Sequence, residues 1–386
     1  MIHSNSEGDI YIEEMPLLLV HLREEEKGAD ARLSEVLSYA LDGYAYETAT
    51  EISAFEDYVN RWRHLEKTQN RKNPVQGRIL FAVPLGTSGI NLELYRLIRF
   101  LREHPDFLNG FVGGLLVDSE NDLYSKSAAK DLVFAANCAG CAFVGRPLVE
   151  GTRTLSNYTI VSNNLGTDLM GAYRESAAGL VKEVLGTDCV RKKCPKVLVL
   201  HASSHKTSNT YAIWNRVKEQ LPEMEIREIG LRNGTLSDCA GCPYKMCLHF
   251  GEQGSCFYGG VMVEDVYPAV READAIVMLC PNYNDALSAN MTAFINRLTA
   301  LFRTTRFYDK ALFGIIVSGY SGSDLLAGQL VTALNMNKTF YLPGNFCMME
   351  TANNAGAAMK LPGIEDRIKE FSEKMTHILI KETQNS

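Results

Sequence analysis

The sequence predicts an α/β protein whose C-terminal half is a doubly wound, parallel sheet of five strands, preceded by a second α/β domain. Short apolar runs alternate with helical patterns from residue 196 onward, which is typical of parallel strands joined by crossover helices. A polar turn at 203–210 follows the first run. A strand, glycine turn and helix at 79–103 repeat this unit in outline. We therefore expect domains at 1–190, with 1–77 as an N-terminal extension, and at 191–386.

The C-terminal half contains five strand–helix pairs. Its last helix is indicated by apolar residues at helical spacing, from Ile364 through Phe371 to Leu379. Ligands of such sheets bind at the carboxyl ends of the strands, where the strand order reverses. The expected strands are 196–201, 224–231, 274–280, 311–318 and 338–346, and the expected helices are 209–220, 261–272, 289–303, 322–335 and 364–380.

The N-terminal half has a weaker pattern. An apolar strand at 16–22 precedes two charged helical segments, and a polar stretch at 69–77 reads as a linker. Strand–turn–helix units follow at 79–103 and 111–137. The turn at 86–89 contains two glycines and could bind phosphate, but an ordinary βα turn is the favoured interpretation. The role of residues 1–190 stays open at this point.

The turn after the first C-terminal strand has the composition of a phosphate site. A helix N-terminus offers free N–H groups and a positive dipole, so it binds anions readily. Here the turn adds hydroxyl, amide and cationic donors in place of glycines, so the nucleotide motifs G-x-G-x-x-G and G-x-x-x-x-G-K-[ST] are absent. A capped, polar surface turn is the alternative. The candidate phosphate-binding residues are Ser203, His205, Lys206, Ser208, Asn209 and Thr210.

Two further loops leave the expected strands at the same edge, and each contains one tyrosine. Both are small and polar, and each tyrosine ring is suited to lie against a planar ligand. A phosphate site combined with two such loops is what flavin mononucleotide (FMN) needs, although asparagine and tyrosine also occur as simple turn formers. The candidate ring-binding residues are Pro281, Asn282, Tyr283, Asn284, Ser318, Gly319 and Tyr320.

Residues 196–386 resemble the NADPH-dependent FMN reductase family, especially its iron–sulfur flavoprotein branch. The family's first loop, G-S-P-R-x-x-S-N-T, corresponds to A-S-S-H-K-T-S-N-T at 202–210, with alanine, serine and histidine in place of glycine, proline and arginine. The P-x-Y loop matches 281–283, and the glycine-rich third loop matches 318–323. The family's later D-R pair reads Asn296-Arg297 here. The resemblance implies a flavodoxin-like fold, and the first domain is then a candidate for a degenerate flavodoxin-like copy.

Four cysteines lie within eighteen residues between the second expected strand and its helix. Short C-x2-C spacing beside glycine and proline suits a 4Fe–4S cluster or a zinc ion, since both need converging thiolates. The resemblance implies a cluster in this loop, but the spacing here is longer than the family's compact motif. Zinc and free redox-active thiols remain alternatives. The candidate metal ligands are Cys239, Cys242, Cys247 and Cys256.

Composition limits the class of partner. The 39 basic and 46 acidic residues give a net charge of −7, which favours neither nucleic acid nor an anionic membrane. No apolar run approaches the roughly 18 residues that span a bilayer. The first fourteen residues lack an apolar signal core, and ten cysteines without one suggest a reducing compartment, so we expect a cytoplasmic protein.

Together these features predict an FMN-dependent oxidoreductase. The resemblance implies that NAD(P)H or a reduced carrier supplies electrons, which pass through the flavin, and through a 4Fe–4S cluster if one is present, to a small-molecule or protein acceptor. It also implies a homodimer or homotetramer. Hydride transfer needs no acid or base, so no catalytic side chain is named. The alternative is a non-enzymatic flavin and iron–sulfur electron carrier or redox sensor, and a flavin-free, zinc-binding scaffold is a third reading.

Overall fold

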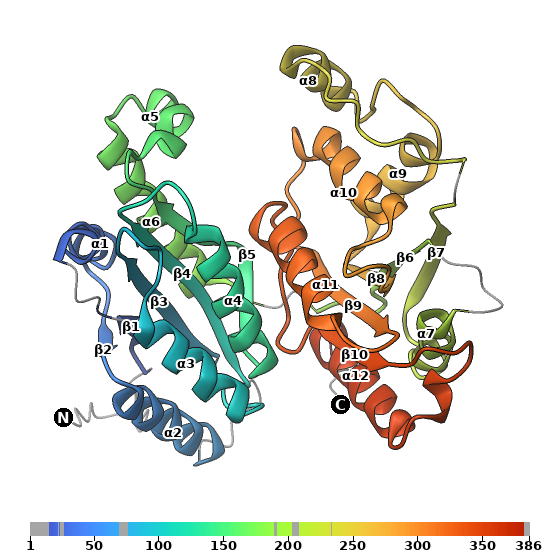
Figure 1. Ribbon diagram of the computed structural model, residues 1–386, viewed down its shortest axis with the longest axis horizontal. Coiled ribbons are helices and arrows are strands. Elements are labelled where there is room, and N and C mark those ends of the chain that lie inside the picture. The colour runs from blue at the N-terminus through green and yellow to red at the C-terminus, as the bar shows by residue number, and fades with distance from the viewer. Residues whose placement is uncertain are drawn as a thin grey trace, which may run out of the picture.

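Two parallel sheets of five strands form the framework of the computed structural model, one in each half of the chain (Figure 1). The structure describes residues 15–21, 23, 27–68, 76–188, 191–202, 208–232 and 234–381. The strand orders are β2-β1-β3-β4-β5 and β7-β6-β8-β9-β10, so both sheets follow the flavodoxin-like order 2-1-3-4-5. The strands are β1 Leu17–His21, β2 Tyr46–Ala49, β3 Gly77–Leu85, β4 Phe111–Ser119, β5 Ala142–Gly151, β6 Lys196–His201, β7 Glu225–Gly230, β8 Ala275–Pro281, β9 Ala311–Ser318 and β10 Cys347–Thr351.

Helices cover both faces of each sheet, because the central strands are apolar on both sides. One face of the first sheet packs against α1 (Lys27–Ala40) and α6 (Leu169–Gly186), and the matching face of the second packs against α7 (Asn209–Lys218) and α12 (Ile364–Leu379). No helix in the described ranges is long and apolar enough to cross a membrane. The opposite faces pack against α2 Ile52–Thr68, α3 Leu92–Glu103, α4 Ser125–Cys138, η2 Met262–Val266, α9 Tyr267–Glu272, α10 Ala289–Phe302, α11 Ser323–Leu330 and η3 Val331–Met336. The remaining helices are η1 Ser156–Tyr158, α5 Thr159–Leu165, α8 Tyr244–Glu252 and η4 Ala358–Lys360.

The architecture predicted from the sequence is confirmed: two α/β domains, the second a five-stranded doubly wound sheet. Residues 1–77, expected as an N-terminal extension, contribute β1 and β2 to the first sheet. The strand expected at 338–346 is wrong, because β10 begins only at Cys347. Pro343 has no N–H to donate and Asn345 has a φ of 51°, so this stretch cannot continue a regular ladder.

The two halves meet edge to edge through a pseudo-two-fold axis. Phe143 in β5 and Leu342 before β10 exchange backbone hydrogen bonds of 2.8 and 3.0 Å as an antiparallel bridge. These two residues are 199 positions apart in sequence. The same spacing relates the register pair Leu115↔Leu148 of the first sheet to the pair Gly314↔Cys347 of the second. The same position of each half therefore pairs with itself, as at the centre of a symmetric dimer.

Two buried asparagines hold this contact in the same way from opposite sides. Asn137 Nδ2 donates to the carbonyl oxygen of Cys141 in its own half and of Pro343 in the other (2.9 and 2.7 Å). Asn335 Nδ2 donates to the corresponding oxygens of Phe340 and Val144 (2.8 and 2.9 Å). Apolar core residues are continuous across the contact on both faces. The chain is thus built as two copies of one topology packed as an intramolecular dimer.

Candidate functional site

The carboxyl ends of β6, β8, β9 and β10 bring four loops to one edge of the second sheet. The first loop leads into α7, whose N-cap is Ser208: its Oγ accepts a hydrogen bond from the Tyr211 N–H at 3.3 Å. Thr210 is buried and its Oγ1 lies 2.8 Å from the Ser208 oxygen. The predicted phosphate-binding residues Ser203, His205 and Lys206 lie outside the described residues.

Asn209, a predicted phosphate ligand, instead links the first loop to the segment after β10. Its Nδ2 donates to the carbonyl oxygens of Ala352 and Asn354 at 3.1 and 2.9 Å. Its Oδ1 accepts from the Ala358 N–H at 3.3 Å. Both ends of the amide are therefore used within the protein, so in this arrangement Asn209 positions a loop.

Asn282 likewise links the second loop to the third. Its Nδ2 lies 3.1 Å from Ser318 Oγ and 3.0 Å from the carbonyl oxygen of Ser321. It also lies 3.1 Å from Asp285 Oδ1, while Asn282 Oδ1 accepts from the Asp285 N–H at 2.8 Å. Asn284 and Asp285 have φ values of 56° and 57°, a left-handed turn that these two residue types tolerate. The second loop is consequently a tight turn fastened to the third.

The two predicted aromatic side chains are open to solvent at this edge. Tyr283 is 54% exposed and Tyr320 is 82% exposed, although large aromatic rings are usually covered. The hydroxyl of Tyr320 accepts a hydrogen bond of 3.0 Å from Asn353 Nδ2. A β-carbon on Gly319 would lie 3.1 Å from Asn353 Oδ1, so glycine permits this close approach. Tyr320 is thus held by its tip while its ring stays available to a planar ligand.

The fourth loop, residues 352–356, was not predicted from the sequence. It reads A-N-N-A-G, a small and polar turn after an apolar strand, and this was the available signal. Placing the last strand too early hid it. Three asparagines join the four loops, and we call them the loop-linking asparagines. Asn209 joins the first loop to the fourth, Asn353 the fourth to the third, and Asn282 the third to the second.

A carboxylate beneath the first loop fixes the helix that begins there. Glu228 on β7 accepts hydrogen bonds from Tyr211, Trp214 and Lys218 of α7 at 2.6, 3.1 and 2.8 Å. Burial opposes its charge, but these donors outweigh burial and lower the pKa of Glu228. Burial and the bond to Glu228 raise the pKa of Tyr211 to about 12. α7 therefore stays aligned with its N-terminus at the first loop.

The four predicted metal-binding cysteines lie together on the insert between β7 and β8, but not around a common point. Cys239 is exposed, and the other three are half-buried free thiols. Burial and nearby thiols, those of Cys242, Cys239 and Cys256, raise the pKa of Tyr258, which places three of the four near one ring. Among the described residues, no three histidine, cysteine or acidic side chains are arranged to hold a metal ion. The thiols suit iron or zinc chemically, while the described geometry does not fit a cluster, so the metal set stays a prediction.

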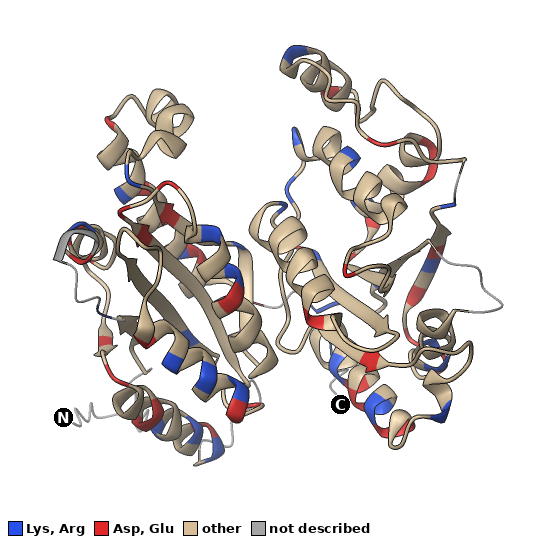
Figure 2. Cartoon of the chain, in the orientation of Figure 1, with Lys and Arg blue, Asp and Glu red and all other residues tan. Residues whose placement is uncertain are grey.

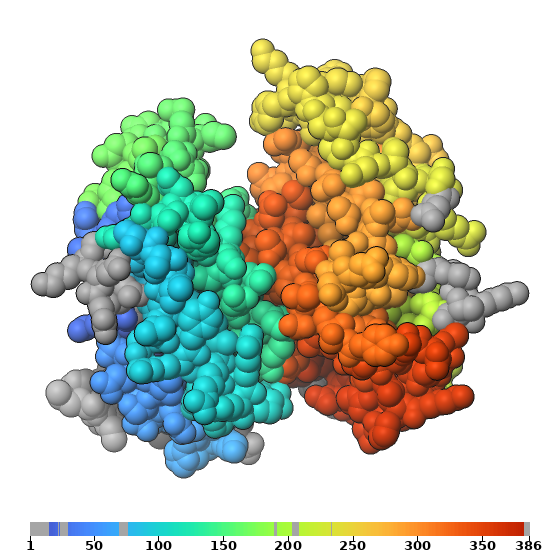
Figure 3. Space-filling model, viewed as in Figure 1, coloured from blue at the N-terminus to red at the C-terminus, as the bar shows by residue number. Residues whose placement is uncertain are grey.

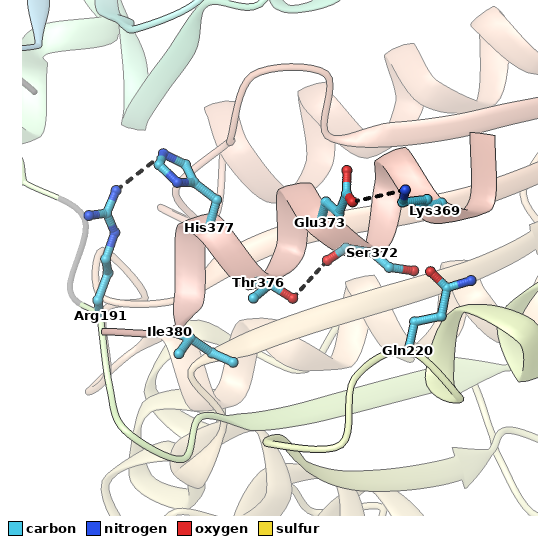
Figure 4. Close-up of a pocket in the computed structure, with 8 residues that line it drawn as sticks. All are labelled: Arg191, Gln220, Lys369, Ser372, Glu373, Thr376, His377 and Ile380. Carbon is cyan, nitrogen blue, oxygen red and sulfur yellow. Dashed lines mark hydrogen bonds and ion pairs between the residues drawn. The ribbon is translucent and has the colours of Figure 1, made fainter. Parts of the chain in front are cut away.

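A separate cavity of about 620 Å³ lies away from these loops, over α12 and the connection between the two halves (Figure 4). Arg191 contacts His377 Nε2 at 3.3 Å and Lys369 pairs with Glu373 at 3.7 Å. The cavity includes none of the predicted site residues. Its lining residues are Arg191, Gln220, Lys369, Ser372, Glu373, Thr376, His377 and Ile380.

Several solved structures are similar to this chain over about half of its length. No curated protein matches the chain. Three solved structures are similar to it: an NAD(P)H:quinone oxidoreductase from Methanothermobacter marburgensis, with 14% identity over 48% of this chain and 98% of that one and a TM-score of 0.37; an azoreductase from Bacillus anthracis str. Sterne, with 16% identity over 48% and 98% and a TM-score of 0.35; and a flavodoxin, WrbA-like protein from Agrobacterium tumefaciens, with 14% identity over 48% and 99% and a TM-score of 0.30.

The family match covers the stretch that contains the four loops. Residues 195–354 match the NADPH-dependent FMN reductase family, which confirms the resemblance predicted from the sequence and supports its enzyme class, an NAD(P)H-dependent flavin oxidoreductase. The match begins before β6 and ends within the fourth loop. The strands β6 to β10 and the first three loops therefore lie within the stretch that is similar to this family.

Proposed function

We propose that the C-terminal domain binds one FMN across the four loops and passes electrons from NAD(P)H to a small-molecule or protein acceptor. The observation that carries this proposal is the set of loop-linking asparagines, which hold two exposed tyrosines beside the N-terminus of α7 within the family-matched stretch. Bound FMN supplies hydride and electron transfer, and the protein supplies binding and orientation.

Each loop has a distinct task in this proposal. The first loop and the α7 N-terminus hold the phosphate through Ser203, His205, Lys206 and Ser208. The ring lies against Tyr283 and Tyr320, which exclude water from its faces. Pro281, Asn282, Asn284, Ser318 and Gly319 shape the second and third loops around it. Asn209 and Thr210 act from beneath, through the contacts described above.

We further propose that Cys239, Cys242, Cys247 and Cys256 act as one group near the flavin domain. A 4Fe–4S cluster or redox-active free thiols would exchange electrons with the flavin, whereas a zinc ion would have a structural role only. Binding either metal requires the thiols to converge further than in the described arrangement. Support comes from their density in one insert and from their gathering near Tyr258 and Tyr267. A cytoplasmic homodimer or homotetramer remains the proposed setting.

The first experiment is an absorption spectrum of anaerobically purified protein, with iron, zinc and sulfide analysed on the same sample. We expect flavin bands and one FMN per chain, together with steady oxidation of NADPH or NADH in the presence of a quinone. A flavin spectrum without turnover would favour the electron carrier. Protein that takes up no added FMN would contradict the proposal.

A second experiment tests the loop-linking asparagines directly. Asn353→Ala removes the hydrogen bond to Tyr320, so we expect FMN to bind about five- to tenfold more weakly, the effect of one hydrogen bond. Asn354→Ala is the matched control, because Asn354 contributes its carbonyl oxygen to these bonds. Equal FMN affinities of the two variants in fluorescence titrations would remove Tyr320 from the site.

A further inference from the structure

Four cations gather where the two halves meet, on the side away from the flavin loops. Arg303 and Arg306 follow α10, Lys338 follows η3, and Arg146 comes from β5 of the other half. We call these four residues the cationic rim. Figure 3 shows the surface hollowed between α5 and α8 above the contact of the two halves, and Figure 2 shows basic residues on the connection from α10 to β9 beside this hollow.

Aromatic rings bring the members of the cationic rim close together. Lys338 Nζ and Arg306 Cζ lie 5.2 and 4.4 Å from the centre of the same Phe302 ring. Arg303 Cζ lies 4.7 Å from the centre of the Tyr244 ring, on the cysteine-bearing insert. Arg146 follows Gly145, where a β-carbon would collide with the carbonyl oxygen of Thr339, the residue after Lys338. Burial and the charges of Arg303 and Arg146 lower the pKa of Lys338.

The charges of the cationic rim are not balanced within the described protein. Lys338 is only 7% exposed, and none of the four rim residues takes part in the ion pairs of the described chain. Arg303 Nε is buried without a hydrogen bond. The acid nearest in sequence, Asp309, pairs with Lys310 at 3.5 Å. Lys338 is the buried member of the rim, whereas Arg146 and Arg306 are exposed and Arg306 donates to the carbonyl oxygens of Phe302 and Thr305. A buried cation without an ion pair is costly, so an anionic partner is expected at Lys338.

The pseudo-two-fold axis provides an internal comparison. At the same spacing of 199 positions, Arg146, Arg303 and Lys338 correspond to Asn345, His104 and Ala139. On that matched rim, Asn345 Nδ2 donates to Asp106 Oδ1 at 3.1 Å. The position equivalent to Asp106 is Thr305, which lies between Arg303 and Arg306 of the cationic rim. One rim therefore has an internal acceptor, and the other has extra cations and no acid.

We propose that the cationic rim binds a phosphate group, either free or carried by a small metabolite. Three guanidinium groups and one ammonium match the several oxygens and the double charge of a phosphate better than a single carboxylate does. The near-complete burial of Lys338 favours a small ligand over an acidic protein surface. The overall charge of −7 also means that a general attraction for anions does not explain the cluster.

The test uses the full chain with excess FMN, so that the flavin phosphate site is already filled. Thermal unfolding is followed while inorganic phosphate replaces chloride at constant ionic strength. We expect the midpoint to rise with saturation at one site per chain, because a ligand of the folded state stabilises it. ADP is titrated in parallel: tighter binding than phosphate indicates a metabolite-borne group, and equal or weaker binding indicates free phosphate.

Three variants decide the outcome. Lys338→Met removes a cation, and Thr305→Asp supplies the acid that the matched rim has at Asp106. Each variant is expected to weaken phosphate binding about tenfold or more. Lys369→Met, at an exposed lysine paired with Glu373, is the control and should leave the phosphate response unchanged. A midpoint that does not respond to phosphate in the parent protein, or that responds equally in Lys338→Met and the parent, would overturn the proposal.

Discussion

The two domains share one strand order but close their carboxyl edges with opposite chemistry. In the C-terminal domain, Asn209 on α7 donates to the carbonyl oxygen of Ala352. In the N-terminal domain Arg153 is the residue 199 positions before Ala352, and Arg32 on α1 donates to its carbonyl oxygen at 3.3 Å. The first edge is linked by neutral amides and the second by a charged side chain.

That charged side chain is paired with a buried acid. Arg32 Nη2 and Nε lie 2.7 and 2.9 Å from the two oxygens of Asp118, whose side chain is fully buried at the end of β4. The equivalent residue of the other domain is Val317. The N-terminal edge is closed by this buried ion pair, whereas the C-terminal edge offers a helix N-terminus to an anion. Under the proposed function, edge chemistry rather than topology distinguishes the copy that binds FMN.

The largest effect is expected from Arg32→Leu, which leaves Asp118 buried without its partner. Burial already raises the pKa of Asp118 despite Arg32, so its unpaired charge is costly. We expect a loss of about 3–5 kcal/mol of unfolding free energy in urea denaturation.

The double variant Arg32→Leu, Asp118→Leu is the control for this ion pair. Replacing both partners removes the uncompensated charge, so most of the lost stability should return. A single variant as stable as the parent would mean that the ion pair does not close the N-terminal edge.

A smaller effect, equal in both halves, is expected at the pseudo-two-fold contact. A β-carbon on Gly344 would collide with the carbonyl oxygen of Gly140, and one on Gly145 with that of Thr339. Gly140 and Thr339 are themselves equivalent and both have positive φ, 97° and 69°. Gly145→Ala and Gly344→Ala should each cost about 1–3 kcal/mol, as overpacking does.

Gly179→Ala provides the contrast. Gly179 lies within α6, and a β-carbon there meets nothing within 4 Å. Alanine should therefore stabilise the protein by about 0.5–1 kcal/mol. Unequal losses at Gly145 and Gly344 would show that the two sides of the contact are not equivalent.

The limits of sequence-based prediction are visible on either side of this contact. The strands β6 to β9 were predicted within two residues, because buried parallel strands are continuous apolar runs. β10 was misplaced because Phe340 and Leu342 are apolar for another reason: they are buried where the halves meet. A local pattern does not separate these two causes of burial.

The loops of the candidate site were predictable from the sequence, but the hydrogen bonds that join these loops were not. The polar turns with Tyr283 and Tyr320 follow from composition and from the edge rule for parallel sheets. The bonds of Asn209 and Asn353 join segments more than thirty residues apart or at opposite ends of the domain, so they depend on the folded arrangement. For the same reason, cysteine spacing alone did not establish a metal geometry.

The smallest expected effect is a pH dependence that distinguishes the two domains at the base of their first helices. The donors Tyr211, Trp214 and Lys218 lower the folded-state pKa of Glu228 below the ordinary value of 4.5, whereas burial raises the pKa of Asp118. The depressed pKa of Glu228 contributes stability above about pH 5, and this contribution is lost as the pH falls through the folded-state value.

Glu228→Gln should therefore be less stable than the parent by about 1 kcal/mol at pH 7, and the gap should shrink between pH 5 and the acid transition. Unfolding free energies measured across this range give the comparison. An exposed acid, Glu373→Gln, should show no such convergence, because its pair with Lys369 is solvent-screened. A gap between Glu228→Gln and the parent that stays constant to low pH would mean that α7 is held by the shape of the Glu228 side chain rather than by its charge.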